Sequence, residues 1–191
     1  ASLGVPRVTA LDFFARWRVR LGYLLAVVVL WLARPTPHSI LIGAALGASG
    51  LWIRAYAAGY LHKQEVLTVT GPYARTRNPL YFGSSFLALG TAVATHSVWA
   101  AGLILLYFSL VYSFVMRREE LELQRKHGAT FADYAAAVPL FFPWLSTGAG
   151  GADNGARFSW AQYRKNHEYQ AAIGFALLLI GLIVIWWLRL R

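Results

Sequence analysis

The sequence predicts an all-α, polytopic membrane helix bundle of about five transmembrane helices, and three observations support this class. First, 58% of the 191 residues are hydrophobic and 14% are charged, whereas a soluble domain has about 45–50% apolar and roughly 25% charged residues. Second, several apolar stretches approach the roughly 20 residues that a membrane-crossing helix needs. Third, the basic residues flank these stretches and form no continuous stripe, which argues against a nucleic-acid partner despite the net charge of +10.

The composition excludes further classes. The chain has no Cys, so a disulfide scaffold, a thiolate metal site, an iron–sulfur cluster and a cysteine nucleophile are all excluded. Its 8 Trp, 10 Tyr and 11 Phe offer ample apolar surface to bury, which excludes an intrinsically disordered chain. We expect no metal site.

The first two expected spans follow an amphipathic N-terminal segment, 1–20. The first span covers 21–33; the competing interpretation of a cleaved signal peptide would leave the other spans unexplained. The second span covers 39–60, is rich in small residues, and spaces Gly43 and Gly47 as in a G-x-x-x-G motif. This spacing permits close helix packing within one chain or between two. We favour packing within the chain and leave the oligomeric state open.

The third and fourth spans share one apolar region, 80–116, which is too long for a single crossing. His96 and Ser97 interrupt it, so we expect a helical hairpin with a tight turn near 95–98. The fifth span, 171–188, ends in Trp and Arg residues that are typical of an interfacial anchor.

The basic residues predict the orientation. With a cytoplasmic N-terminus and five spans, all of the 18 Lys and Arg except Arg34, Arg189 and Arg191 fall on the cytoplasmic side, as the positive-inside rule requires. Both long polar segments, 62–78 and 117–170, are then cytoplasmic.

The segment GPYARTRNPLYFG, 71–83, contains a candidate anion site. Asn78 is a favoured N-cap and Pro79 suits the first helical position. The third span therefore begins with free backbone N–H groups and a positive dipole end, which favour a carboxylate or phosphate. Arg75 and Arg77 would strengthen anion binding. The alternative is interfacial anchoring without a ligand.

The hairpin brings an acidic pair to the same membrane face. Glu119 and Glu120 end the fourth span, where acidic side chains oppose the helix dipole and invite a cationic partner. The alternative is neutralisation by neighbouring arginines, or an ordinary i,i+4 surface pair between Arg118 and Glu122. A cation donor, an anion donor and an apolar floor together suit a zwitterionic ligand such as S-adenosylmethionine.

Two motifs then carry a family resemblance. The run 71–83 resembles the signature G-P-Y-x-x-x-R-H-P-x-Y-x-G of the isoprenylcysteine carboxyl methyltransferase and phospholipid methyltransferase families. The run 119–143 resembles their E-E-x-x-L-x-x-x-F-G-x-x-Y-x-x-Y-x-x-x-V-P tail, and the resemblance covers roughly 50–143. Asn78 replaces the usual His, so a ring nitrogen that titrates near neutral pH is absent there. His127 replaces the usual Phe.

The resemblance implies a transmembrane methyltransferase core, 21–143. Beyond it, composition indicates a linker, 144–158, and a C-terminal helix with the fifth span, 159–191, where Ser159 is a candidate N-cap. The resemblance implies no function for 144–170 or for the fifth span. It does imply S-adenosylmethionine as the cofactor, bound on the cytoplasmic face. The expected catalytic residues are Arg77 and Glu120.

The expected cofactor-binding residues divide by charge. The two glutamates would take the methionyl ammonium or the ribose hydroxyls, and the start of the third span would take the carboxylate; Arg77 could instead orient an acceptor carboxylate. Two tyrosines and a glycine would shape the pocket. The full set is Tyr73, Arg77, Asn78, Pro79, Tyr81, Gly83, Glu119 and Glu120.

The expected acceptor is a lipophilic small molecule or prenylated substrate that enters from the bilayer among membrane lipids. An isoprenylcysteine-type carboxylate is the first candidate and a phospholipid amine the second. Glu168 or His167 would then line the acceptor side, although a solvated or lipid-headgroup role is favoured for both.

Two functions of a different class compete with methyl transfer. One is a nicotinamide-dependent sterol reductase, which would need a larger cofactor site and more spans than five. The other is a non-catalytic membrane scaffold or transporter. The spans are nearly free of charge, with Arg54 near the end of the second, and this argues against transport.

Overall fold

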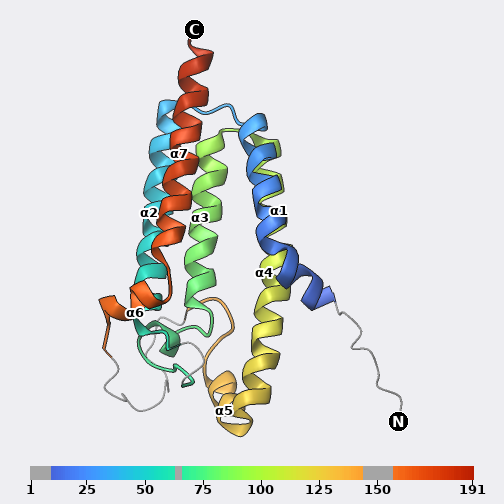
Figure 1. Ribbon diagram of the computed structural model, residues 1–191, viewed down its shortest axis with the longest axis vertical. Helices are drawn as coiled ribbons and strands as arrows, with labels where there is room; N and C mark the ends of the chain where they lie inside the picture. Colours follow the sequence, from blue (N-terminus) through green and yellow to red (C-terminus); the bar gives the residue numbers. More distant parts are fainter. Residues whose placement is uncertain (1–9, 63–65, 144–156) are drawn as a thin grey trace.

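The computed structural model describes residues 10–62, 66–143 and 157–191, and every regular element in them is a helix (Figure 1). The elements are α1 (Ala10–Leu32), α2 (Pro37–Tyr60), η1 (Gly71–Ala74), α3 (Pro79–Thr95), α4 (Val98–His127), α5 (Ala129–Ala137), α6 (Trp160–Lys165) and α7 (Tyr169–Arg189). The predicted all-α class is confirmed. The predicted linker lies, up to residue 156, outside the described residues, as does the predicted N-terminal segment before Ala10.

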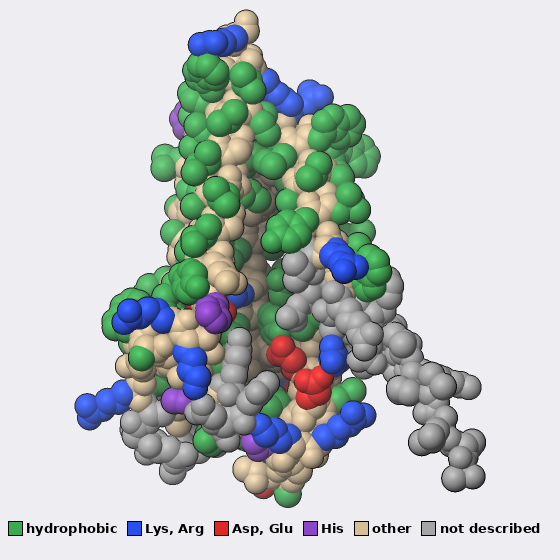
Figure 2. All heavy atoms as spheres, in the orientation of Figure 1, with side chains coloured by type: hydrophobic (Ala, Val, Ile, Leu, Met, Phe, Trp, Pro, Cys, Tyr) green, Lys and Arg blue, Asp and Glu red, His purple; other side chains and the backbone are tan. Residues whose placement is uncertain are grey.

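Three of these helices, α2, α4 and α7, are long and apolar enough to cross a membrane. Helix α1 adds a shorter apolar segment, Arg20–Leu32, and α3 has 17 residues, fewer than the roughly 20 of a straight span. Hydrophobic side chains cover the upper part of the surface in Figure 2, which is typical of a membrane-facing surface. The chain is a membrane helix bundle in which the first and third expected spans are shorter than the other three.

The long helices alternate in direction. Helices α1, α3 and α7 run upward in Figure 1, whereas α2 and α4 run downward and α4 continues furthest, to α5 at the lower end. The predicted tight turn is confirmed: α3 ends at Thr95, His96 adopts a left-handed φ of 47°, and the Ser97 side chain accepts a hydrogen bond from the N–H of Ala100 at the start of α4. The side of the membrane on which the lower end lies stays a prediction.

Small residues let α2 and α3 touch through their backbones. A Cβ added at Gly90 would lie 2.6 Å from the carbonyl oxygen of Gly43, and one at Gly50 would lie 2.5 Å from the carbonyl oxygen of Gly83. Any side chain at these positions would therefore separate the helices. Gly47 instead faces the ring of Phe175 from α7, so the small-residue face of α2 packs within the chain, as the sequence favours.

The segment before α7 is attached to the end of α2. The N–H of Ser159 donates to the carbonyl of Gly59 (3.1 Å), and Asn166 Nδ2 donates to the carbonyls of Ala58 (2.8 Å) and Leu61 (2.9 Å). Ala58 and Gly59 lie in the last turn of α2 and Leu61 is its C-cap, where carbonyls lack the usual intrahelical partners, although the Ala58 carbonyl also accepts from the Leu61 N–H. The predicted cap is also confirmed, because the Ser159 side chain accepts from the N–H of Gln162. The C-terminal segment thus acts as the C-cap of α2.

We predict that Gly90→Ala destabilises the bundle, because its methyl group would meet the Gly43 carbonyl. Overpacking of this kind costs about 1–3 kcal/mol, and the thermal unfolding midpoint of detergent-purified protein, followed by Trp fluorescence, should fall.

The matched control is Gly102→Ala in α4, where an added Cβ meets nothing within 4 Å. Alanine is the better helix former by about 1 kcal/mol, so this midpoint should stay or rise. Equal shifts in the two variants would contradict the α2–α3 contact.

Candidate active site

A cavity of about 600 Å³ opens at the lower end of the bundle. In Figure 2, acidic side chains gather beside basic ones in this region. Its volume falls in the range of roughly 300–1,000 Å³ that small-molecule and cofactor sites occupy. The lining includes Arg54, His62, Tyr73, Arg77, Asn78, Pro79, Tyr81, Tyr112, Glu119, Glu120, Glu122, Lys126, His127, Phe131, Tyr134 and Glu168.

The start of α3 forms one wall of the cavity. Asn78 occupies the N-cap position and Pro79 the first helical position, as predicted. The Asn78 side chain, however, makes no capping hydrogen bond; its Nδ2 donates to the carbonyl of Leu140 (3.0 Å), in the chain that follows α5. The predicted side-chain cap is therefore wrong, because the Leu140 carbonyl takes the amide instead. The positive end of α3 keeps its attraction for an anion.

An ion pair joins α4 to the residue before this wall. Arg77 Nη1 lies 2.5 Å from Glu120 Oε1, with side chains 16% and 25% exposed. This contact lacks the alignment of a hydrogen bond, so Glu120 Oε1 has an ionic partner but no hydrogen bond, and the buried Arg77 Nε has no hydrogen-bond partner either. The hairpin thus brings the arginine and the acidic pair together, as the sequence predicts. Arg118 and Glu122 form the expected i,i+4 pair (3.0 Å) on the surface.

The second glutamate of the pair is held by a tyrosine. Tyr81 Oη donates to Glu119 Oε1 at 2.5 Å, and the Tyr81 ring meets Tyr112 edge-on with centroids 5.3 Å apart. Both residues line the cavity. The hydrogen bond therefore orients one carboxylate oxygen of Glu119 beside the ion pair.

Tyr73 brings a buried phenol to the same cavity. It lies in η1, is 7% exposed, and its hydroxyl has no hydrogen-bond partner. Burial raises the pKa of Tyr73 well above its usual range, and the charges of Glu168 and Glu119 raise that pKa further. Tyr134 Oη donates to the carbonyl of Tyr73 (2.7 Å), and burial also raises the Tyr134 pKa. Both phenols stay protonated at neutral pH, so the Tyr73 hydroxyl is an unused donor.

Two residues singled out in the sequence lie away from the cavity. Gly83 is not part of its lining: a Cβ there would meet the Arg54 side chain at 2.7 Å and the Gly50 carbonyl at 2.8 Å. The position of Gly83 thus serves helix packing. Arg75 is exposed and also lies outside the lining.

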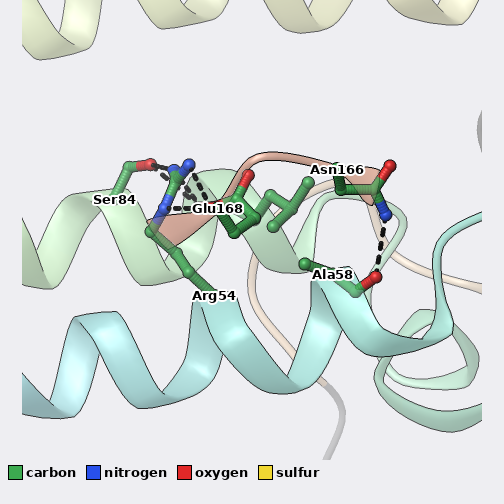
Figure 3. A network of polar contacts seen from close by, with 6 residues as sticks. Arg54, Ala58, Ser84, Asn166 and Glu168 are labelled. Atoms are coloured by element: carbon green, nitrogen blue, oxygen red, sulfur yellow. Dashed lines mark hydrogen bonds and ion pairs between the residues drawn. The ribbon is translucent and has the colours of Figure 1, made fainter. Parts of the chain in front are cut away.

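A second ion pair was missed by sequence reasoning. Arg54 Nη2 lies 2.7 Å and Nε 3.1 Å from Glu168 Oε2, and the Glu168 side chain is 8% exposed (Figure 3). The sequence favours a solvated role for Glu168 and His167, but only His167 is exposed. One signal was present in the sequence: a charge inside a span calls for a partner, and Arg54 is such a charge.

Residues 17–130 match the phospholipid methyltransferase family. The chain belongs to this family. The matched residues include the whole 71–83 motif, Glu119 and Glu120, so the first ion pair lies inside the family region. Glu168 and helices α6 and α7 lie beyond it.

Two curated relatives carry names from metal resistance. The chain is 32% identical to "Nickel-cobalt-cadmium resistance protein NccN" of Alcaligenes xylosoxydans xylosoxydans over 139 residues, which cover 68% of this chain and 64% of the relative. It is also 32% identical to "Cobalt-zinc-cadmium resistance protein CzcN" of Cupriavidus metallidurans over 139 residues, covering 68% and 63%. The match thus spans less than two thirds of either relative. No solved structure gave a significant match. Within the described residues, no group of three or more His, Asp or Glu could hold a metal ion.

We predict that Asn78→Ala lowers the free energy of unfolding by about 1 kcal/mol, because the Leu140 carbonyl loses the closer of its two donors and keeps only the longer contact from Thr76 Oγ1 (3.4 Å). The midpoint of chemical or thermal unfolding in detergent measures this loss. Ser113→Ala, which removes an exposed hydroxyl bonded to the carbonyl of Ser109, serves as the control and should stay within about 0.5 kcal/mol of the parent. A loss no larger than the control's would contradict the role of Asn78 in holding the chain after α5.

Proposed function

We propose that this protein is an integral membrane methyltransferase that uses S-adenosylmethionine to methylate a lipophilic acceptor. The observation that carries the proposal is the Arg77–Glu120 pair, which faces a 600 Å³ cavity at the start of α3 in a chain of the phospholipid methyltransferase family. Opposite charges in one cavity complement a zwitterionic ligand.

The donor set of the cavity fits this cofactor. Among the described residues, Tyr73 Oη and Arg77 Nε are buried donors without hydrogen-bond partners, and both suit a carboxylate. Glu120 Oε1 lies against Arg77 Nη1, but a carboxylate has further acceptor capacity for an ammonium or a ribose hydroxyl. Buried donors of this kind normally have partners, so a ligand that supplies both signs of charge would complete them.

Different residues of the cavity would then bind different groups of the cofactor. Arg77 and the N–H end of α3 would hold its carboxylate, while Glu119 and Glu120 would hold its ammonium or ribose. Pro79 and Tyr81 would form the adjacent wall. When bound, the cofactor supplies an electrophilic methyl group on a sulfonium. The chain contributes positioning and a fixed polar environment in place of water.

Two acceptor chemistries fit a lipophilic substrate from the bilayer: the carboxylate of an isoprenylcysteine-type molecule and the amine of a phospholipid. A carboxylate would need a cation of its own, yet Arg54 pairs with Glu168, and Arg77, beside Glu120, is the residue assigned to the cofactor carboxylate. The lining carries four glutamates against three basic side chains, a net charge of −1 with His neutral, in a chain of net charge +10. This balance favours the amine. The relatives' names describe resistance and not a reaction, so they do not choose between acceptors.

The positive-inside rule supports a cytoplasmic position for the cavity, because the basic segments lie at the same end of the bundle.

The competing function is a non-catalytic membrane scaffold or transporter, which would either bind no cofactor or bind it without transferring a methyl group.

We predict that calorimetric titration of detergent-purified protein with S-adenosylmethionine detects binding, and that Arg77→Ala combined with Glu120→Ala weakens it at least about tenfold. Removing both partners leaves neither charge buried and unpaired. Arg117→Ala is the matched control, since Arg117 is exposed on the same helix and outside the lining, and its affinity should stay within about twofold. Absence of binding by the unmodified protein would refute the cofactor assignment.

Turnover separates the enzyme from the scaffold. After incubation in lipid with methyl-labelled S-adenosylmethionine, label should appear in the lipid extract, and the labelled product identifies the acceptor as an amine or a carboxylic acid. Cofactor binding without transferred label would favour a non-catalytic role.

A further inference from the structure

The Arg54–Glu168 pair places a carboxylate from outside the family region in the cavity, and an inference about it rests on the proposed function. Glu168 precedes α7, beyond the matched residues 17–130, and lines the cavity together with Arg54. Arg54 comes from α2, so the pair joins the second span to the C-terminal segment (Figure 3).

Arg54 is fully engaged by the protein. Its Nε and Nη2 both donate to Glu168 Oε2, and its Nη1 donates to the carbonyl of Leu80 and to Ser84 Oγ. The guanidinium is therefore fixed between α2, α3 and the residue before α7. An arginine with its three nitrogens engaged in this way is poorly placed to capture a ligand carboxylate of its own.

Glu168 is engaged on one side only. Both contacts from Arg54 reach Oε2, and within the described part of the chain Oε1 accepts no hydrogen bond. Oε1 is also absent from the buried atoms that lack a partner, so this oxygen is not sealed inside the protein. A carboxylate has two acceptor oxygens, so one oxygen of a residue that lines the cavity is available to a ligand.

Attachment of the C-terminal segment does not by itself account for this buried pair. Ser159 and Asn166 already bond the segment to the last turn of α2, and Gln162 Nε2 adds a further bond to the Leu61 carbonyl (2.5 Å). A buried ion pair stabilises little relative to apolar packing, because desolvation offsets its attraction. Glu168 neutralises Arg54, but neutralisation uses only Oε2 and leaves Oε1 for a ligand.

The pair lies further along the bundle than the first ion pair. Ser84, which Arg54 contacts, is five residues after Pro79 in α3, about 8 Å along the helix axis. Arg54 is likewise well inside α2, six residues before Tyr60. Glu168 therefore lies on the apolar side of the Arg77–Glu120 pair, where the head of a lipophilic acceptor would arrive.

We propose that Glu168, oriented by Arg54, binds the head group of the methyl acceptor through Oε1, and that this head group is an amine that arrives protonated. Oε1 then takes a proton from the amine, so that the nitrogen lone pair can accept the methyl group as its bond to the cofactor sulfur breaks. The unused hydroxyl of Tyr73 lies in the same lining, close enough for the charges of Glu168 and Arg54 to act on it. Three features support a cation at this place: the available oxygen, the engaged arginine and the net negative lining. Glu168 is thus an acceptor-specificity residue that the C-terminal segment supplies.

The test uses two soluble eight-carbon probes, octylamine and octanoate, titrated calorimetrically into detergent-purified protein without cofactor. The unmodified protein should bind octylamine saturably and more tightly than octanoate. Glu168→Gln keeps an oxygen that accepts from Arg54 but removes the charge, so it should weaken octylamine binding about ten- to hundredfold, the value of a charge-assisted hydrogen bond. Affinity for S-adenosylmethionine should stay within about twofold.

Asn166→Ala is the matched control, because it removes two bonds of the same segment to the end of α2, at Ala58 and Leu61, and the Asn166 side chain is not part of the cavity lining. Its octylamine affinity should stay within about twofold of the parent. Equal losses in Glu168→Gln and Asn166→Ala would show that Glu168 only tethers the segment. Unchanged octylamine binding in Glu168→Gln, or no preference for the amine probe in the parent, would equally overturn the proposal.

The same measurements separate this inference from the proposed function. Glu168-dependent amine binding without any labelled lipid product would leave the subsite standing and refute the methyltransferase. Labelled product, together with an octylamine affinity that Glu168→Gln leaves unchanged, would support the methyltransferase and refute the subsite.

Discussion

Helices α2 and α3 approach so closely that a Cβ at Gly83 would lie 2.8 Å from the Gly50 carbonyl and 2.7 Å from the Arg54 side chain. The same missing side chain that permits the backbone contact also leaves the space that Arg54 occupies. Arg54 can therefore cross from α2 to the Leu80 carbonyl and Ser84 of α3, and there it meets Glu168. The position of the second ion pair depends on this glycine contact.

The distribution of acidic residues follows from the cost of burying charge. Eight residues of the chain are Asp or Glu, and four of them line the cavity. Two of these four pair with an arginine that also lines it, and Glu119 accepts from Tyr81. Each pair leaves polar capacity unused, at Arg77 Nε in one and at Glu168 Oε1 in the other. Most charges of the cavity are paired within the chain, but these groups are left for a charged ligand.

Hydropathy and short motifs in the sequence predicted those structural features that depend on residues close together along the chain or joined by a short turn. His96 and Ser97 interrupt one apolar run, so the hairpin and the meeting of Arg77 with Glu120 followed from helix length and a tight turn. The prediction that the Asn78 side chain caps α3 was wrong, because its amide bonds instead to the carbonyl of Leu140, which is distant in sequence. Gly83 was assigned to the cofactor pocket because its motif adjoins Tyr81, but its helical phase directs it to α2.

The sequence by itself determined the bundle, the family and the first charged pair, since hydropathy, basic flanks and two motifs are local and additive signals. Only the tertiary structure decided that Glu168 enters the cavity. The chain turns just before α7 through His167, with its left-handed φ of 55°, while Asn166 bonds to the end of α2, and this turn brings Glu168 beside Arg54. A span charge such as Arg54 demands a partner, but which of the distant carboxylates can reach it depends on how the helices pack.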